Sequence, residues 1–307
     1  MYLSSIINFN NNFVSFLKIK INELETRAIG HFSISTEIFL GELKRNIHKE
    51  KNTIFLWFIN KEVSNNFLLK KWKEKILIGP RFILKPLFQL INRFAILKFL
   101  KSPFRHWNDK NYKVWQISDI YNVLPKTKPN IVFKEQEKKF CNNYLKKFNS
   151  KTDKYICFFA RTHHYRKDYI QLKDSNIKDQ IQGIIKLCKK QNVKAFRIGS
   201  KHEKLSKLNK SIIDYSNSKF KSEMLDIYLP MNCKFMVGTS SGMDVIPALN
   251  RKKTLLVNKG DLFCLNLNNQ SYTPLMLPKK FKKISNNQLI KYSSVFNLKL
   301  TEFMYEK

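Results

Sequence analysis

Residues 234–242 read KFMVGTSSG, and this stretch does most to define the fold. Lys234–Val237 has the pattern of a short buried strand, and Gly238–Gly242 is a tight turn of small hydroxyl residues. The following MDVIPALN predicts a short helix, and KKTLLVN predicts the next strand. Such a turn presents backbone N–H groups and hydroxyls to one spot, where the dipole of the helix favours a phosphate. Tight packing, with Ser240 or Ser241 as a helix N-cap, is the alternative interpretation.

Length and composition indicate a folded protein of two domains. The chain has 307 residues, of which 43% are apolar, and a formal net charge of +34. Such a charge is typical of proteins that bind nucleic acid, anionic lipid or polyanionic ligands, but here the lysines are spread along the chain, as on an ordinary solvated surface. Five cysteines without CxxC spacing predict buried free thiols in a reducing compartment. No run of about 18 uncharged apolar residues occurs, so no membrane span is expected.

Strand and helix patterns alternate along both halves of the chain. In the first half we expect a strand and turn at 25–34, a helix at 35–46, strands at 52–60 and 75–80, and helices at 64–75 and 82–101. In the second half we expect helices at 134–148, 176–192 and 222–232 and strands at 154–160, 193–199 and 211–216. Continuous apolar strands between helices indicate parallel sheets covered on both faces.

The expected fold is therefore α/β, with two Rossmann-like parallel-sheet domains. Their expected bounds are residues 1–135 and 136–307, and ligand would bind in the cleft that the two domains face, between the C-terminal strand ends. Several ligand signatures are missing from the sequence, namely GxGxxG, GxxxxGK[ST], DxD and HExxH. Their absence disfavours the common dinucleotide and P-loop sites and a metal-dependent mechanism.

Three strand ends of the second half are candidates for an anion site. They read CFFARTHHYRKDY, FRIGSKHEK and VGTSSG, and the first two supply Arg161 and Arg197. Because parallel strands end at one edge of a sheet, both guanidiniums are expected to face the Ser-rich turn, where they would hold a diphosphate without a metal. For Arg197 the alternative is a salt bridge to Asp214, Glu223 or Asp226.

These segments resemble bacterial glycosyltransferases of the two-domain GT-B type, which are distantly similar to the fucosyltransferase-like enzymes. The resemblance covers most of the chain, and it rests on the order of RAIGHFSISTEIFLGEL, FFARTHHYRKDY with LKDSNI, FRIG, IIDYS, SEMLDIYL and CKFMVGTSSG with Pro247. Family members carry a His-x-Arg-Asp strand end and an Arg-Asn pair before the helix. Here those places read Phe159-Ala160-Arg161-Thr162 and Lys173-Asp174.

The resemblance implies transfer of a hexosyl or deoxyhexosyl group, with inversion and without metal or cofactor, in bacterial surface polysaccharide biosynthesis. The C-terminal domain would bind the nucleotide-sugar donor, and the N-terminal domain a glycan or lipid-linked acceptor. From the free thiols and the basic, apolar segment at 82–101 we expect a cytoplasmic protein, peripheral at the inner face of the plasma membrane. The expected donor-binding residues are Arg161, Arg197, Gly199, Glu223, Gly238, Thr239, Ser240, Ser241, Gly242 and Asp244.

Two of these residues have simpler alternatives. Glu223 resembles the acidic residue that holds a ribose or sugar hydroxyl, or it is an ordinary negative charge at a helix N-terminus. Asp244 touches the donor, or it caps the segment after the turn. The candidates for the catalytic base are His31 and Glu37 after the first strand, and His163 or His164 in the Arg161 loop.

The basic, apolar helix expected at 82–101 is open to two interpretations. Such a helix docks on an anionic membrane beside a lipid-linked acceptor, or it packs in the core of the first domain. Two alternatives to the transferase also remain. One is a nucleotide-sugar or phosphate-binding protein of the same fold without catalysis. The other is a basic nucleic-acid-binding protein, although no recognisable motif or concentrated basic stripe supports it, so we expect no nucleic-acid partner.

Overall fold

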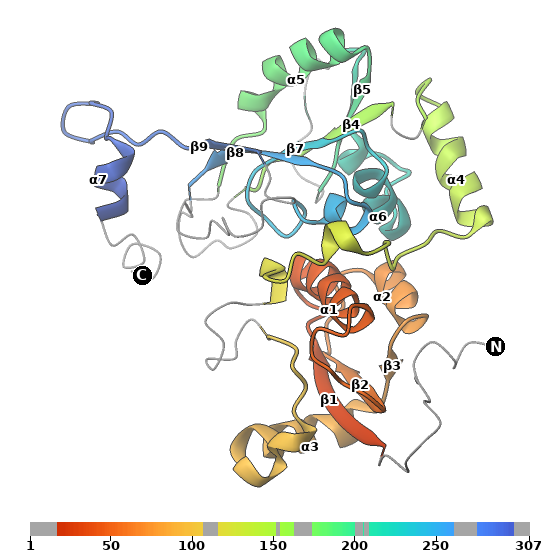
Figure 1. The fold of residues 1–307 in the computed structure, drawn as a ribbon. Helices are drawn as coiled ribbons and strands as arrows, with labels where there is room; N and C mark the ends of the chain where they lie inside the picture. Colours follow the sequence, from red (N-terminus) through yellow and green to blue (C-terminus); the bar gives the residue numbers. More distant parts are fainter. Residues whose placement is uncertain are drawn as a thin grey trace. The chain divides into compact units, whose positions relative to one another are not determined.

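The computed structural model of the chain describes residues 17–106, 116–151, 154–162, 174–199, 205, 209–260 and 275–297. The chain divides into two compact units, unit 1 (residues 1–132) and unit 2 (residues 133–307). Each unit has its own parallel sheet (Figure 1), with the strand order β1-β2-β3 in unit 1 and β6-β5-β4-β7-β8-β9 in unit 2. The predicted α/β fold class is confirmed. The ligand cleft between the domains stays a prediction.

Unit 1 begins with an edge strand that sequence analysis misplaced. The elements of this unit are β1 (Lys18–Leu24), the π-helical turn η1 (His31–Ser35), α1 (Thr36–Lys44), β2 (Thr53–Ile59), α2 (Asn66–Lys73), β3 (Leu77–Ile78), α3 (Arg81–Arg93) and the 3-10 turns η2 (Ala95–Leu100), η3 (Gln116–Ser118) and η4 (Leu124–Lys126). The strand expected at 25–34 is wrong, because that segment contains η1. Its place is taken by KIKINEL, whose alternating lysines suit a strand at the edge of a sheet.

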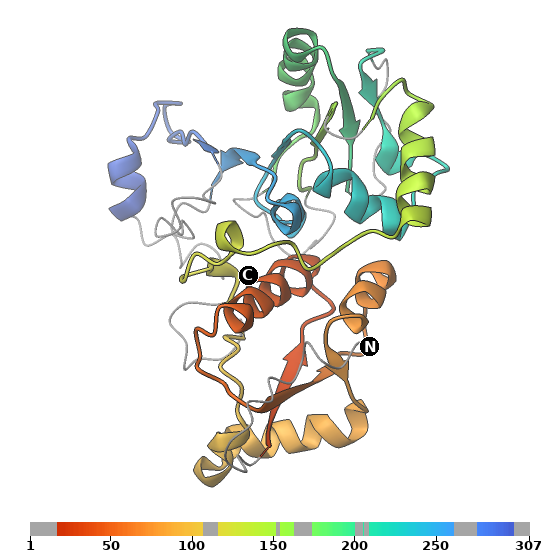
Figure 2. The ribbon, with the colours of Figure 1, turned by 45° about the vertical axis from the view of Figure 1, so that its right-hand side comes forward.

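Helices cover both faces of the sheet of unit 1. Phe39 of α1 packs edge-on against Phe55 and Trp57 of β2, with ring centroids 5.4 and 5.6 Å apart. Phe58, which points to the opposite face, packs against Phe88 of α3 at 5.4 Å. Figures 1 and 2 show α1 and α3 on opposite sides of the strands. This arrangement is the one that continuous apolar strands predict.

The prediction of a single helix at 82–101 is wrong about its length, because α3 ends at Arg93. Phe94 is extended (φ −107°, ψ 122°), and η2 follows it. The break changes the direction of the chain, so that Leu97 and Leu100 of η2 pack on the same buried cluster as α3. The core of that cluster is Ile21, Phe58, Leu84 and Ile91.

Unit 2 contains the strands that sequence analysis predicts and the three helices predicted before the Ser-rich turn, and in addition β9 and α7. The elements of this unit are α4 (Glu135–Lys146), β4 (Tyr155–Phe158), α5 (Lys178–Gln191), β5 (Lys194–Arg197), β6 (Ile212–Ile213), η6 (Tyr215–Asn217), α6 (Glu223–Met231), β7 (Met236–Gly238), η7 (Ile246–Asn250), β8 (Thr254–Lys259), β9 (Leu275–Pro278) and α7 (Tyr292–Asn297). Ile184 of α5 packs on one face of the sheet, against Ile156 and Phe158. On the other face, Tyr144 of α4 lies 6.1 Å from Phe196.

The segment after the Ser-rich turn is not the helix that the sequence predicts. Its hydrogen bonds join residues three apart, from Asp244 N–H to the Ser241 carbonyl (3.2 Å) and from Ala248 N–H to the Val245 carbonyl (3.1 Å). The chain forms the short 3-10 turn η7 here, with Pro247, which has no N–H to donate, in its first turn. No α-helix therefore begins at the turn.

The predicted buried free thiols are confirmed for Cys141, Cys157, Cys188 and Cys233, while Cys264 lies outside the described residues. Burial raises the pKa of the Cys157 thiol well above its ordinary value, and this keeps the thiol protonated and unreactive. Among the helices that the structure describes, none has the length and apolar character needed to cross a membrane.

Gly238 allows the close approach of Phe159 to the end of β7, and this contact gives a test of the fold. A Cβ atom on Gly238 would lie 2.1 Å from Phe159 Cε1. We expect Gly238→Ala to lower the free energy of unfolding by about 1–3 kcal/mol, measured by urea denaturation. The control is Gly183→Ala in α5, where a Cβ meets nothing within 4 Å. That change should stabilise the protein by about 0.5–1 kcal/mol. Equal effects of the two changes would contradict the packing shown at Gly238.

Candidate active site

The strand order of unit 2 reverses between β4 and β7 (Figure 1). From β4 the sheet continues through β5 and β6, and from β7 it continues through β8 and β9. In open parallel sheets, ligands bind at such a reversal, outside the carboxyl ends of the strands. The chain leaves β4 through residues 159–162 and leaves β7 through residues 239–242. These are two of the three segments that sequence analysis predicts as an anion site.

The two loops are joined by a hydrogen bond between Arg161 and Thr239. The backbone N–H of Arg161 donates to Thr239 Oγ1 over 2.8 Å. Thr239 is fully buried, and Phe159 N–H donates to the Val237 carbonyl at 3.1 Å. The Thr239 hydroxyl therefore holds the Arg161 loop in place at the strand reversal.

Lys259 is a cation of this site that sequence analysis missed. It ends β8, is only 5% exposed, and donates from Nζ to Ser240 Oγ over 2.9 Å. Lysine is almost never buried unless opposite charge or good acceptors surround its ammonium group. The position of Lys259 beside the Ser240 hydroxyl places a positive charge at the turn where sequence analysis expects a phosphate.

Asp174 lies between two further cations of unit 2. Arg161 Nε is 3.6 Å from Asp174 Oδ1, and Lys279 Nζ donates to the Asp174 carbonyl over 2.7 Å. Burial lowers the pKa of Lys279, and the charge of Asp174 offsets part of that effect. The backbone N–H of Lys279 also donates to the Lys259 carbonyl at 3.0 Å. These contacts connect Arg161, Lys259 and Lys279 along the C-terminal edge of β4, β8 and β9.

Asp244 acts as the cap that sequence analysis allowed as an alternative. Its Oδ2 accepts from Ser241 N–H over 3.3 Å. This bond uses an N–H that was expected to face a phosphate, and it adds a negative charge there. The prediction that a helix dipole acts at the turn is wrong, because η7 is a 3-10 turn of five residues that begins at Ile246. Anion binding at the turn would therefore depend on side-chain cations. A role of Gly242 in donor binding stays a prediction.

Arg197 forms the salt bridge that sequence analysis named as its alternative role. Its side chain is buried on β5, and Nη1 lies 3.3 Å from Asp214 Oδ2. Asp214 also accepts from Ser216 Oγ at 2.8 Å and from Asn217 Nδ2 at 2.9 Å. An ion pair of this kind, anchored by further hydrogen bonds, supports a structural role for Arg197.

The remaining donor-site candidates of unit 2 lie around the start of α6. Gly199 has φ +107°, a conformation that favours glycine, and its carbonyl accepts from Lys221 Nζ at 2.8 Å. Lys221 Nζ also lies 2.6 Å from Asp226 Oδ1. Glu223 is exposed in the first turn of α6, where its charge complements the helix dipole. Contact of Gly199 or Glu223 with a donor stays a prediction.

The three base candidates differ in their surroundings. His31 is half-buried at the first residue of η1, and its role as the base stays a prediction. Glu37 is fully buried, and both carboxylate oxygens accept from Asn130 N–H at 3.2 Å. A general base must reach its substrate, so this burial argues against Glu37 and for a structural role. His163 and its alternative His164 lie outside the described residues.

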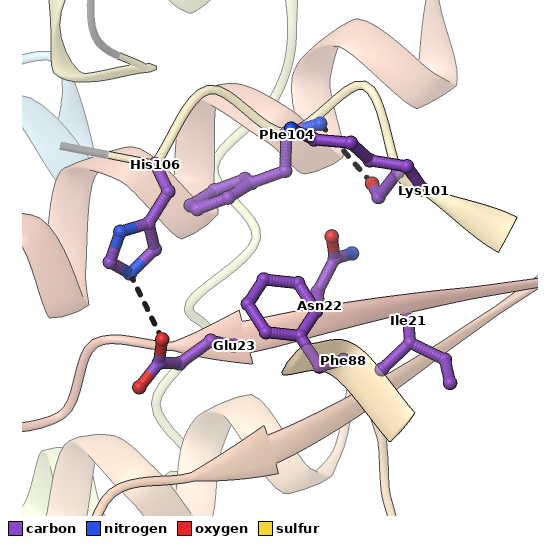
Figure 3. Close-up of a pocket in the computed structure, with 8 residues that line it drawn as sticks. Ile21, Asn22, Glu23, Phe88, Lys101, Phe104 and His106 are labelled. Atoms are coloured by element: carbon purple, nitrogen blue, oxygen red, sulfur yellow. Dashed lines mark hydrogen bonds and ion pairs between the residues drawn. The ribbon is translucent and has the colours of Figure 1, made fainter. Parts of the chain in front are cut away.

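Unit 1 holds one small pocket that sequence analysis missed (Figure 3). Its cavity volume is about 10 Å³, and it is lined by Ile21, Asn22, Glu23, Phe88, Lys101, Ser102, Phe104 and His106. Figure 3 shows His106 and Glu23 pointing toward one another, with His106 Nε2 3.8 Å from Glu23 Oε2. A cavity needs roughly 10–15 Å³ of such volume to hold one water molecule, so this pocket suits a single water rather than a nucleotide sugar.

No protein-family model matches the sequence, and no curated protein matches it either. Among solved structures, the chain is similar to the glycosyl transferase family 9 protein from Veillonella parvula, with a TM-score of 0.53, 11% identity, and coverage of 94% of this chain and 99% of that one. It is also similar to ADP-heptose lps heptosyltransferase II from E. coli, with a TM-score of 0.51, 13% identity, and coverage of 85% and 90% respectively. At such identities the similarity shows the fold, which is that of GT-B glycosyltransferases. The predicted resemblance to fucosyltransferase-like enzymes is not shown.

Proposed function

We propose that this protein is a glycosyltransferase that moves a sugar from a nucleotide-sugar donor to a glycan or lipid-linked acceptor, with inversion and without a metal. The observation that carries the proposal is the group of cations at the strand reversal of unit 2, where the Lys259 ammonium donates to Ser240 Oγ and the Arg161 loop is held by its backbone N–H, which donates to Thr239 Oγ1. The GT-B fold supports glycosyl transfer, and the similar E. coli protein is named for ADP-heptose. A nucleotide diphosphate sugar is therefore the proposed class of donor.

In inverting transfer the nucleotide leaves as a diphosphate and gains negative charge in the transition state. Positioned cations lower the barrier most when they contact the atoms on which that charge develops. We assign this role to the Lys259 ammonium and the Arg161 guanidinium. Ser240 and Thr239 position them, because one hydroxyl accepts from the ammonium and the other from the Arg161 backbone. His31 is the base that we propose for the acceptor hydroxyl.

A panel of nucleotide sugars, tested by thermal shift on the full chain, examines this function. A donor present at about 100 times its Kd stabilises a folded protein by about 2.7 kcal/mol, so the correct nucleotide should raise the Tm clearly. Release of nucleoside diphosphate from that donor then tests catalysis. Binding without release would favour the inactive sugar-nucleotide-binding alternative. No shift with any donor, together with salt-sensitive binding to an oligonucleotide, would favour the nucleic-acid alternative.

Insensitivity to chelation is a separate prediction. Within the described residues, no group of three or more His, Cys, Asp or Glu side chains is placed to hold a metal ion. We expect the donor-induced shift in Tm and the turnover rate to be the same with and without EDTA, since side-chain cations would neutralise the diphosphate. Loss of turnover in EDTA, with recovery on adding magnesium or manganese, would contradict the metal-free mechanism.

A further inference from the structure

The outer face of α3 and η2 is apolar and exposed to solvent. It consists of six residues, which we call the docking face: Phe82, Ile83, Leu90, Phe94, Ile96 and Phe99. Phe82, Ile96 and Phe99 are the most exposed of them, at 79%, 82% and 69%. The inner side of the same segment already packs on the core of unit 1. A surface segment that is apolar on both sides is unusual in a soluble protein, and it indicates an interaction site.

The charges around the docking face are of one sign. Residues 75–108 contain no Asp or Glu, and their Lys and Arg residues are Lys75, Arg81, Lys85, Arg93, Lys98, Lys101 and Arg105. Arg93 and Lys98 are exposed, and the Arg93 guanidinium lies 5.7 Å from the centroid of the Phe94 ring. Cations therefore border the apolar residues directly. Exposed aromatic and aliphatic side chains with Lys and Arg beside them are typical of segments that lie in the interface of an anionic bilayer.

We propose that the docking face binds the surface of an anionic lipid bilayer, with its apolar side chains at the boundary between headgroups and acyl chains. Figures 1 and 2 show α3 and the turn after it at the far side of the unit 1 sheet from α1. A second copy of the chain fits this face less well, because a symmetric contact would bring the same cations against one another. The proposal concerns unit 1 and does not depend on the donor site of unit 2.

Co-sedimentation of the full chain with lipid vesicles tests the proposal. One set of vesicles is phosphatidylcholine alone, and the other is an equal mixture of phosphatidylcholine and phosphatidylglycerol. We expect binding to the mixed vesicles and at least about tenfold weaker binding to the neutral ones, because each Lys or Arg near an anionic surface contributes about fivefold in affinity. Added salt should weaken the binding, since surface charges are screened.

Two triple variants separate the apolar and electrostatic contributions. Phe82→Ser, Ile96→Ser and Phe99→Ser together should reduce the affinity for mixed vesicles at least about tenfold, because the side chains no longer leave water. Lys85→Gln, Arg93→Gln and Lys98→Gln together should reduce it by on the order of 100-fold. The matched apolar control is Leu275→Ser, Leu277→Ser and Ile284→Ser, at exposed positions of unit 2. The matched charge control is Lys186→Gln, Lys189→Gln and Lys190→Gln on α5.

Three results would overturn the proposal. They are equal binding to neutral and mixed vesicles, an unchanged affinity in both docking-face variants, and equal losses in the control variants. Sedimentation velocity without lipid tests whether a second copy of the chain binds the docking face. If the wild type is a dimer and the Phe82, Ile96 and Phe99 changes convert it to a monomer, the face is a self-association surface instead. The donor-induced Tm shift, measured on the same variants, should match that of the wild type, so a failed donor assay and a failed membrane assay are distinguishable.

Discussion

Replacement of Lys259 by Gln is expected to reduce the affinity for the nucleotide-sugar donor by on the order of 10- to 100-fold. A hydrogen bond to a charged group contributes about 1.5–3 kcal/mol, and the amide of Gln carries no charge to give to the diphosphate. The ammonium of Lys259 is buried beside Ser240, so solvent and salt screen it little. Isothermal titration with the donor that the thermal-shift panel identifies measures the loss. The turnover rate should fall as well, because the same contact strengthens as the leaving group gains charge.

Two further variants show whether the effect belongs to the position of Lys259. Lys253→Gln removes one positive charge from an exposed residue just before β8, and it should leave the donor affinity unchanged. Ser240→Ala removes the hydroxyl that positions Lys259 but keeps the ammonium, so its effect should be smaller than that of Lys259→Gln. The assignment is contradicted if Lys259→Gln binds donor like the wild type and only the free energy of unfolding has fallen. Lys259 would then be a structural lysine.

The sequence predicts the sheet of unit 2 well, because its strands are short apolar runs between amphipathic helices. It also identifies the turn at Gly238–Gly242 as a candidate site from local composition alone. The partner of that turn could not be found in this way. Lys259 reaches Ser240 from a position 19 residues later, and only the pairing of β7 with β8 brings the two together. A lysine at the end of an apolar strand is a weak signal until the neighbouring strand is known.

Three other predictions were corrected by the structure, and the sequence shows the cause of some of these corrections but not of others. Pro247 is visible, and its missing N–H lowers the helix propensity of the segment where a helix was predicted. The edge strand Lys18–Leu24 was missed because its lysines hide the alternation of Ile19 and Ile21. The burial of Glu37 is not visible, since its partner Asn130 lies 93 residues away. Local patterns therefore give most element types, whereas tertiary pairing gives the surroundings of each charged side chain.

Replacement of Arg197 by Met is expected to lower the free energy of unfolding by about 3–5 kcal/mol and to leave the donor affinity of the folded protein unchanged. Removing one partner of a buried ion pair leaves the other charge without compensation, and this is more costly than removing both. Here the remaining charge would be Asp214, whose carboxylate would keep only its bonds from Ser216 and Asn217. Urea denaturation gives the stability, and titration at a temperature where the variant is folded gives the donor affinity.

A double-mutant cycle shows whether the cost comes from the pair. Asp214→Asn keeps the shape of the side chain and removes its charge, so the combined Arg197→Met and Asp214→Asn variant should be more stable than the sum of the two single changes predicts. The coupling should fall in the range of about 0.5–3 kcal/mol that is typical of residues in contact. Arg197→Lys should recover part of the stability, because an ammonium restores the charge but not the planar fork of donors. The opposite result would be a free energy of unfolding equal to that of the wild type together with a loss of donor affinity. Arg197 would then belong to the diphosphate site, and the Asp214 contact would only position it.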